Sequence, residues 1–252
     1  MKIFLINLDK NLDRLASFDA QMKAHGLSYE RISAVYGKEM DPKEKARAVR
    51  RFRWWCATGR MPHDGEIGCA LSHGIFYRKM IEGRLPVACV FEDDALLGPD
   101  IKRVIDYVEN VADPNKPQVF MLSNHTPNQL DGEPWLRQAK TMAGTVCSLT
   151  CRERDLGTEG YCLTLKAAEI LLRANYPIVV PCDSWRRFRR MGIIDLFGVN
   201  PTMVNQNRDE FASDLKKDDG GRSALNWVLY KVLRVFGKSL DCVMTKLSGK
   251  GI

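Results

Sequence analysis

An apolar segment followed directly by three carboxylates constrains this chain more than any other feature. Residues 86–91 have the continuous apolar character of a strand buried on both faces, and Glu92, Asp93 and Asp94 follow it. Ligands of α/β proteins collect beyond the carboxyl ends of such strands. Because adjacent carboxylates repel one another, a bound Mg²⁺ or Mn²⁺ would stabilise the triplet. The alternative is a solvated acidic turn, but its position after a buried strand favours a metal site.

The positive charge is unevenly distributed over the 252 residues, which suffice for one large domain or for a domain with an appendage. The net charge is +7, and residues 215–252 hold eight Lys or Arg against three Asp. A second basic run, residues 43–53, has six Lys or Arg against one Glu. Both runs suit a phosphorylated or membrane-surface partner, although such runs are more often solvated faces.

Neither a targeting segment nor a disulfide framework is apparent. The apolar start is too short for a signal peptide, and no apolar stretch is long enough to span a bilayer, which predicts a cytoplasmic protein. The eight cysteines lack a framework spacing, and Cys147 and Cys151 have no second pair or nearby His to complete a zinc site. We therefore expect reduced, structural cysteines.

Strand and helix patterns alternate along the chain, which predicts an α/β fold with a mixed central sheet flanked by helices. The expected strands are 3–8, 29–35, 86–91, 119–122, 145–149, 161–164, 193–199 and 203–204. The expected helices are 11–26, 41–55, 66–83, 100–111, 166–174 and 184–190. A charged linker after these elements separates an α/β domain, residues 1–214, from a C-terminal extension, residues 215–252.

The extension contains the clearest amphipathic helix pattern, at residues 222–238. Its apolar stripe consists of Leu225, Val228, Leu229, Val232, Leu233 and Phe236. Trp227 and Tyr230 flank the stripe beside basic residues, which suits a helix that lies in a membrane interface. Packing on the chain's own domain is the equal alternative.

Several motifs resemble those of glycosyltransferase family 25, which includes bacterial lipopolysaccharide and lipooligosaccharide galactosyltransferases and collagen galactosyltransferases. They are Ile6–Asp9 with Arg14, Ala34–Gly37, Gly65–His73, Glu92–Ala95, Glu159–Tyr161, Pro181–Asp183 and Gln206. The resemblance covers residues 1–214. It implies a GT-A-like fold, a UDP-galactose donor, a divalent metal, a lipid-linked saccharide acceptor and transfer with inversion to a beta linkage.

The resemblance also implies roles for individual residues. Asp94 would bind Mn²⁺ or Mg²⁺, and Glu92 would reach the metal, its water or the ribose. The other contacts to the nucleotide sugar would come from Ile6, Asn7, Leu8, Arg14, Gly68, Ser72, His73, Asp93 and Gln206. The structural alternatives are an ion pair of Arg14 with Asp9 and, for His73, a core position in which its hydrogen bonds are satisfied. The resemblance does not identify a third protein ligand of the metal.

Inverting transfer needs a base that takes a proton from the acceptor hydroxyl. Asp183 is the candidate, and its structural alternative is a cap of the following helix. Asp155 and Glu159 are reserves. Trp185 would stack on an acceptor sugar or pack in the core.

Two other classes of protein share some of these features. Clustered carboxylates also build metal-dependent phosphoester hydrolases, but the four His offer no pair of metal ligands. The basic run 186–190 suits a nucleic-acid-binding protein, but no recognised module accompanies it, so no nucleic acid is expected. We therefore expect a galactosyltransferase at the cytoplasmic face of the inner membrane.

Overall fold

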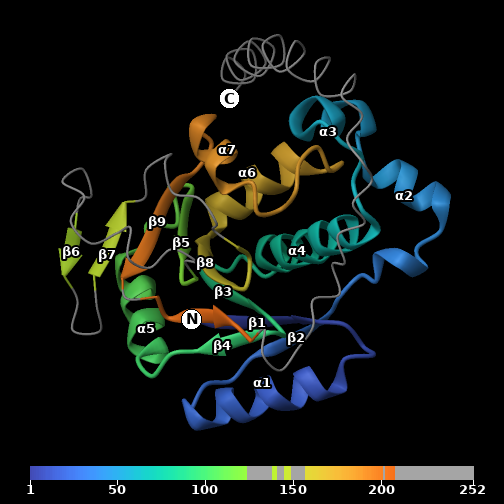
Figure 1. The fold of residues 1–252 in the computed structure, drawn as a ribbon. Helices are drawn as coiled ribbons and strands as arrows, with labels where there is room; N and C mark the ends of the chain where they lie inside the picture. The colour runs from blue at the N-terminus through green and yellow to red at the C-terminus, as the bar shows by residue number, and fades with distance from the viewer. Residues whose placement is uncertain (124–137, 141–144, 149–156, 201, 208–252) are drawn as a thin grey trace.

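The computed structural model describes residues 1–123, 138–140, 145–148, 157–200 and 202–207, in which strands and helices alternate (Figure 1). The strands are β1 (Lys2–Asn7), β2 (Glu30–Ser33), β3 (Val87–Glu92), β4 (Ala95–Leu97), β5 (Gln118–Met121), β6 (Gln138–Lys140), β7 (Thr145–Ser148), β8 (Gly160–Thr164), β9 (Asp195–Asn200) and β10 (Val204–Gln206). The helices are α1 (Leu12–Ala24), α2 (Pro42–Ala48), α3 (Arg51–Thr58), α4 (Asp64–Glu82), α5 (Ile101–Val111), α6 (Leu165–Asn175) and α7 (Trp185–Arg190), with a 3-10 turn at Gly37–Glu39.

Eight strands form one mixed sheet in the order β2-β1-β3-β8-β5-β9-β7-β6, and β10 pairs with β4 in a separate two-stranded sheet. β1 is parallel to β2 and β3, whereas β8 is antiparallel to its two neighbours. The predicted mixed α/β architecture is confirmed. Because β1 and β3 are adjacent and parallel, their carboxyl ends lie at the same edge of the sheet, which brings Asn7 to the acidic triplet.

Helices cover both faces of the large sheet (Figure 1). On one face, α1 and α5 bury Phe18, Met22 and Ile105 against the sheet. On the other face, α4, α6 and α7 contribute a second apolar cluster that contains Phe76 and Trp185. β3 and β8 therefore lie between two apolar layers, which explains why residues 86–91 are continuously apolar.

The single helix predicted for residues 41–55 is wrong, because two helices occupy this stretch. Asp41 caps α2 as expected, and its side chain accepts a hydrogen bond of 2.8 Å from the backbone N–H of Lys43. Val49 then takes an extended conformation and forms a parallel bridge with Ile178. This buried pairing of two β-branched residues outweighs the local helical pattern.

The other predicted elements that fall on described residues are present within two residues of their expected ends. Two short strands, β4 and β6, were not predicted. The helix expected at 222–238, and with it the extension 215–252, lies outside the described residues. Within the described ranges, no helix has both the length and the apolar character needed to cross a bilayer.

Candidate active site

The acidic triplet lies where β3 ends and the chain turns into β4. Asp93 is held by two neighbours: the Asn7 side-chain amide donates to its Oδ2 at 2.8 Å, and Arg14 Nη1 lies 3.2 Å from its Oδ1. Burial raises the pKa of Asp93, while Asn7 and Arg14 oppose that increase. Asp93 is therefore fixed at the carboxyl end of β1 by polar contacts from two other elements.

The alternative pairing of Arg14 with Asp9 is wrong. Asp9 instead accepts hydrogen bonds from Arg31 Nη2 at 2.5 Å and from Ser33 Oγ at 2.7 Å. Arg31 Nε also donates to Asn7 Oδ1 at 2.8 Å. These contacts orient Asn7 so that its amide N–H group faces Asp93. Sequence reasoning missed Arg31, because nothing in its strand pattern indicates a partner at Asn7.

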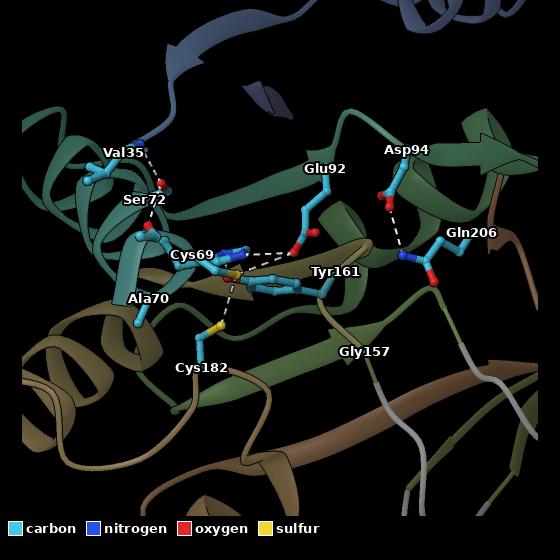
Figure 2. Close-up of polar contacts among 12 residues, drawn as sticks. Val35, Cys69, Ala70, Ser72, Glu92, Asp94, Gly157, Tyr161, Cys182 and Gln206 are labelled. Atoms are coloured by element: carbon cyan, nitrogen blue, oxygen red, sulfur yellow. Dashed lines mark hydrogen bonds and ion pairs between the residues drawn. The ribbon is translucent and has the colours of Figure 1, made fainter. Parts of the chain in front are cut away.

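One oxygen of the Asp94 carboxylate is hydrogen-bonded, and the other has no hydrogen-bond partner within the described ranges. Gln206 Nε2 donates to its Oδ2 at 2.7 Å, so β10 brings this late residue to the triplet, as Figure 2 shows. Its Oδ1 is buried and has no hydrogen-bond partner among the described residues. Burial, and then the carboxylate of Glu92, raise the pKa of Asp94 to about 7. A buried carboxylate oxygen without a donor, among further carboxylates, fits a hard divalent cation.

Glu92 points away from Asp94 towards α4, where it meets His73 (Figure 2). Its Oε1 lies 3.1 Å from His73 Nε2, and His73 Nδ1 lies 2.8 Å from the hydroxyl of Tyr161. The imidazole is 0% exposed, so the satisfied core role for His73 matches its position. Burial disfavours its charged form, but hydrogen bonds to Cys69 and Glu92 outweigh burial and raise the pKa of His73 to about 10.

Gly68 and Ser72 hold the segment after β2 against α4. A Cβ at Gly68 would lie 2.4 Å from the carbonyl oxygen of Val35, so the missing side chain makes room for the chain itself rather than for a ligand. This corrects the expectation for Gly68. Ser72 Oγ accepts a hydrogen bond of 2.8 Å from the N–H of Val35 and donates to the carbonyl of Gly68 at 2.7 Å (Figure 2).

The end of β1 is less accessible than its expected uridine-binding role suggests. Ile6 is buried in the apolar cluster shared with α4, and Leu8 is half-buried. Binding of a nucleotide by Ile6, Asn7 and Leu8 stays a prediction.

Asp183 is exposed just before α7, and the capping alternative for it is wrong. Ser184 occupies the N-cap position, and no side-chain hydrogen bond caps this helix. The dense protein around Asp183, aided by the charges of Glu66 and Glu92, raises its pKa to about 6. A carboxylate with a raised pKa that solvent can reach suits proton transfer.

The other residues considered for acceptor binding or proton transfer are Trp185, Glu159 and Asp155. Trp185 is 0% exposed, and its indole N–H donates to the carbonyl of Gly157 at 3.0 Å, so it packs in the core and does not face an acceptor sugar. Glu159 is buried, and its carbonyl accepts the N–H of Glu92 at 3.0 Å. Asp155 lies outside the described residues.

An ion pair between Arg60 and Glu66, which the sequence did not indicate, lies at the start of α4. Both guanidinium NH₂ groups of Arg60 contact the Glu66 carboxylate, one of them at 2.7 Å, and the N–H of His63 donates to the same carboxylate at 2.9 Å. Burial raises the pKa of Glu66, but Arg60 and His63 outweigh burial and lower it overall. Because His63 is an unusual N-cap residue, the capping-box pattern was not recognisable in the sequence.

The family model described as Glycosyltransferase family 25 (LPS biosynthesis protein) matches residues 1–185. The chain belongs to this family. In this chain the acidic triplet lies where β3 ends, at the carboxyl ends of β1 and β3 in the mixed sheet. Asn7 contacts Asp93 there, and Gln206 contacts Asp94.

Three relatives illustrate the range of the family. A Haemophilus influenzae protein assigned to the glycosyltransferases is 32% identical over 125 residues, which cover 48% of this chain and 40% of that protein. Procollagen galactosyltransferase 1-A of Xenopus laevis is 26% identical over 73% of this chain and 30% of its own length. The lacto-N-neotetraose biosynthesis glycosyltransferase LgtE of Neisseria meningitidis is 26% identical over 42% of this chain and 36% of its own length. The chain thus matches well under half of each of these proteins.

Proposed function

We propose that this protein transfers galactose from UDP-galactose to the saccharide of a lipid-linked lipopolysaccharide or lipooligosaccharide acceptor, with inversion to a beta linkage. Membership of glycosyltransferase family 25 supports sugar transfer. The name of procollagen galactosyltransferase 1-A supports galactose as the donor sugar. The family description, LPS biosynthesis protein, supports a lipopolysaccharide-type acceptor.

The observation that carries the proposal is the buried Oδ1 of Asp94, which has no partner among the described residues and lies beside two more carboxylates. Asp94 is the residue that would hold Mn²⁺ or Mg²⁺ directly, and Glu92, whose Oε1 contacts His73, would reach that ion only through its other oxygen or a bound water. Such an ion neutralises the negative charge that develops on the diphosphate of a nucleotide-sugar donor.

The remaining residues position the carboxylate of Asp94 and the turn that carries it. Gln206 fixes Oδ2 of Asp94, so Oδ1 keeps a single direction. Asn7 and Arg14 hold Asp93, and thereby the turn that follows β3. The uridine would lie along the adjacent edge that Ile6, Asn7 and Leu8 form.

Proton transfer in this proposal belongs to Asp183. Its exposed carboxylate can approach an acceptor hydroxyl, and its raised pKa lets it take a proton near neutral pH. The negative charges of Glu66 and Glu92 favour protonation of Asp183 as the acceptor oxygen attacks the sugar carbon.

A basic surface supports a position at the cytoplasmic face of a membrane. Arg47, Arg50, Arg51 and Phe52 border an open depression of about 610 Å³ at the junction of α2 and α3. The Phe52 side chain is 75% exposed in this basic region. Exposed arginines around an aromatic side chain suit an interface rich in anionic headgroups, to which residues 222–238 would add a second contact.

Calorimetric binding of UDP-galactose with Mn²⁺, with Mg²⁺ and with EDTA tests the proposal. We expect binding that depends on the metal and that Asp94→Ala abolishes. The control variant Asp13→Ala, at an exposed position on α1, should bind like wild type. Competition by UDP-glucose and UDP-N-acetylglucosamine then identifies the preferred donor. Absence of binding for every nucleotide sugar under every metal condition would reject the proposal.

A further inference from the structure

Three potential metal ligands converge beside the acidic triplet but outside the donor site proposed above. Cys69, His73 and Cys182 each offer one ligand atom, and these atoms lie within 4.8 Å of one another. The motifs that hold these residues were assigned above to donor binding and proton transfer, which leaves both sulfur atoms without a function.

The helical spacing of two of these residues explains part of the convergence. Cys69 and His73 lie four positions apart on α4, so both side chains occupy the same face of that helix. Cys182 arrives from the segment between α6 and α7, and its Sγ lies 3.3 Å from Sγ of Cys69 (Figure 2). The cluster therefore joins two parts of the chain that are 113 residues apart.

Glu92 supplies a fourth potential ligand at the end of β3. Its Oε1 lies 3.1 Å from His73 Nε2 and 4.0 Å from Cys69 Sγ. The other imidazole nitrogen of His73 contacts the hydroxyl of Tyr161 at 2.8 Å. Metal-binding imidazoles commonly have their second nitrogen held in this way, because the contact fixes the orientation of the ring.

We propose that Cys69, His73, Cys182 and Glu92 Oε1 bind one zinc ion. Zn–S bonds of about 2.3 Å and Zn–N bonds of about 2.0–2.1 Å separate tetrahedral ligand atoms by about 3.4–3.8 Å. The ligand atoms of Cys69, His73 and Cys182 lie within 4.8 Å of one another, and the separations of 3.3 Å between the two sulfur atoms, 3.1 Å between Glu92 Oε1 and His73 Nε2, and 4.0 Å between Glu92 Oε1 and Cys69 Sγ bracket these values. Binding replaces the thiol protons of Cys69 and Cys182 and the Nε2 proton of His73, and these protons pass to solvent.

The chemistry of the ligands distinguishes this site from the one at Asp94. Two thiolates and an imidazole select zinc, whereas carboxylates and water suit Mg²⁺ and Mn²⁺. In this arrangement, zinc fixes Glu92 and connects α4 to the segment before α7, so it holds Asp183, the next residue after Cys182, in place. Its role is therefore to position the site rather than to react with substrate.

The zinc content of the full-length protein, purified without chelators, tests the proposal. Elemental analysis should find one zinc per chain, and Cys69→Ser and Cys182→Ser should each lose it. Cys56→Ser is the matched control, because Cys56 is a half-buried free thiol on α3 outside the cluster. Replacement by Co²⁺ should give thiolate-to-metal charge-transfer absorption in the wild type and in Cys56→Ser, and this absorption should be absent from both cluster variants.

A second variant separates this site from the donor site. Asp94→Ala should keep its zinc while it loses metal-dependent binding of UDP-galactose, so failure of either proposal is recognisable. Circular dichroism of each variant shows whether it is folded. Three outcomes would overturn the zinc site: protein without zinc that also fails to bind added Zn²⁺, zinc that both cluster variants retain, or a Cys69–Cys182 disulfide in peptides from non-reduced protein.

Discussion

The side-chain amide of Gln206 donates a hydrogen bond of 2.7 Å to Oδ2 of Asp94, which lies 112 residues earlier in the chain. The antiparallel pairing of β10 with β4, which places Gln206 opposite Ala95, makes this contact possible. The contact leaves Oδ1 as the oxygen of this buried carboxylate that has no hydrogen-bond partner in the described part of the chain. Gln206 therefore acts on Asp94, whether or not it also contacts the donor.

Replacement of Gln206 by Ala should weaken metal-dependent binding of UDP-galactose by about tenfold or more, the usual effect of removing a residue that orients a metal ligand. Calorimetry in the presence of Mn²⁺ measures the change. Asn205→Ala is the control, because Asn205 is the neighbouring residue in β10 and is exposed. Equal affinities for wild type and Gln206→Ala would show that the hydrogen bond does not orient Asp94.

We expect the ion pair of Arg60 with Glu66 to make the free energy of unfolding depend on pH. Its contacts lower the pKa of Glu66 below its usual value of 4.5 in the folded state. The stabilisation is therefore fully present above pH 4.5, and it is lost as the pH falls through the lowered pKa. Glu66→Gln should reduce the free energy of unfolding at pH 7 by about 1–2 kcal/mol.

Urea denaturation of wild type and Glu66→Gln at pH 7 and at several values below 4.5 measures this difference, which should shrink as the pH falls. Glu82→Gln, at the exposed opposite end of α4, should change the stability by less than about 0.5 kcal/mol at either extreme. A difference between wild type and Glu66→Gln that is independent of pH would mean that the charge of Glu66 does not stabilise the fold.

Local sequence patterns predict an element correctly where its structure depends on residues that are close together in the chain. The apolar run before Glu92 predicts β3, because both faces of that strand are buried. The spacing of apolar residues predicts α5 in the same way, since Ile101, Val104, Ile105 and Val108 all face the sheet. The acidic triplet could be placed at the sheet edge for the same reason.

Contacts between distant segments could not be predicted from such patterns. The break at Val49 depends on its pairing with Ile178, and neither local sequence indicates the other. Arg14 lies only five residues from Asp9 along the chain but contacts Asp93, because Asp9 is already hydrogen-bonded to Arg31 and Ser33.

The role of Asp183 makes a prediction about catalysis. Asp183→Asn should lower kcat by about 10²–10⁴-fold, the usual contribution of a general base, and should leave the affinity for UDP-galactose unchanged. In the wild type, kcat/KM should fall as the pH drops through about 6, because the protonated carboxyl cannot accept a proton. Steady-state kinetics with Asp195→Asn as the exposed control tests both statements. A loss confined to donor affinity would assign Asp183 to binding instead.

The basic surface at α2 and α3 makes a prediction about membrane binding. Phe52→Ser and Arg51→Glu should each weaken binding to phosphatidylglycerol-containing vesicles, since one basic residue near an anionic surface contributes about 1 kcal/mol, or about fivefold in affinity. Leu12→Ser is the matched control: Leu12 is 67% exposed on α1, which covers the opposite face of the sheet. Sedimentation with neutral and with anionic vesicles gives the affinities, and a deletion of residues 215–252 tests the second expected contact. If the two α3 variants and the deletion all bind like wild type, this protein does not reach its acceptor through the membrane surface.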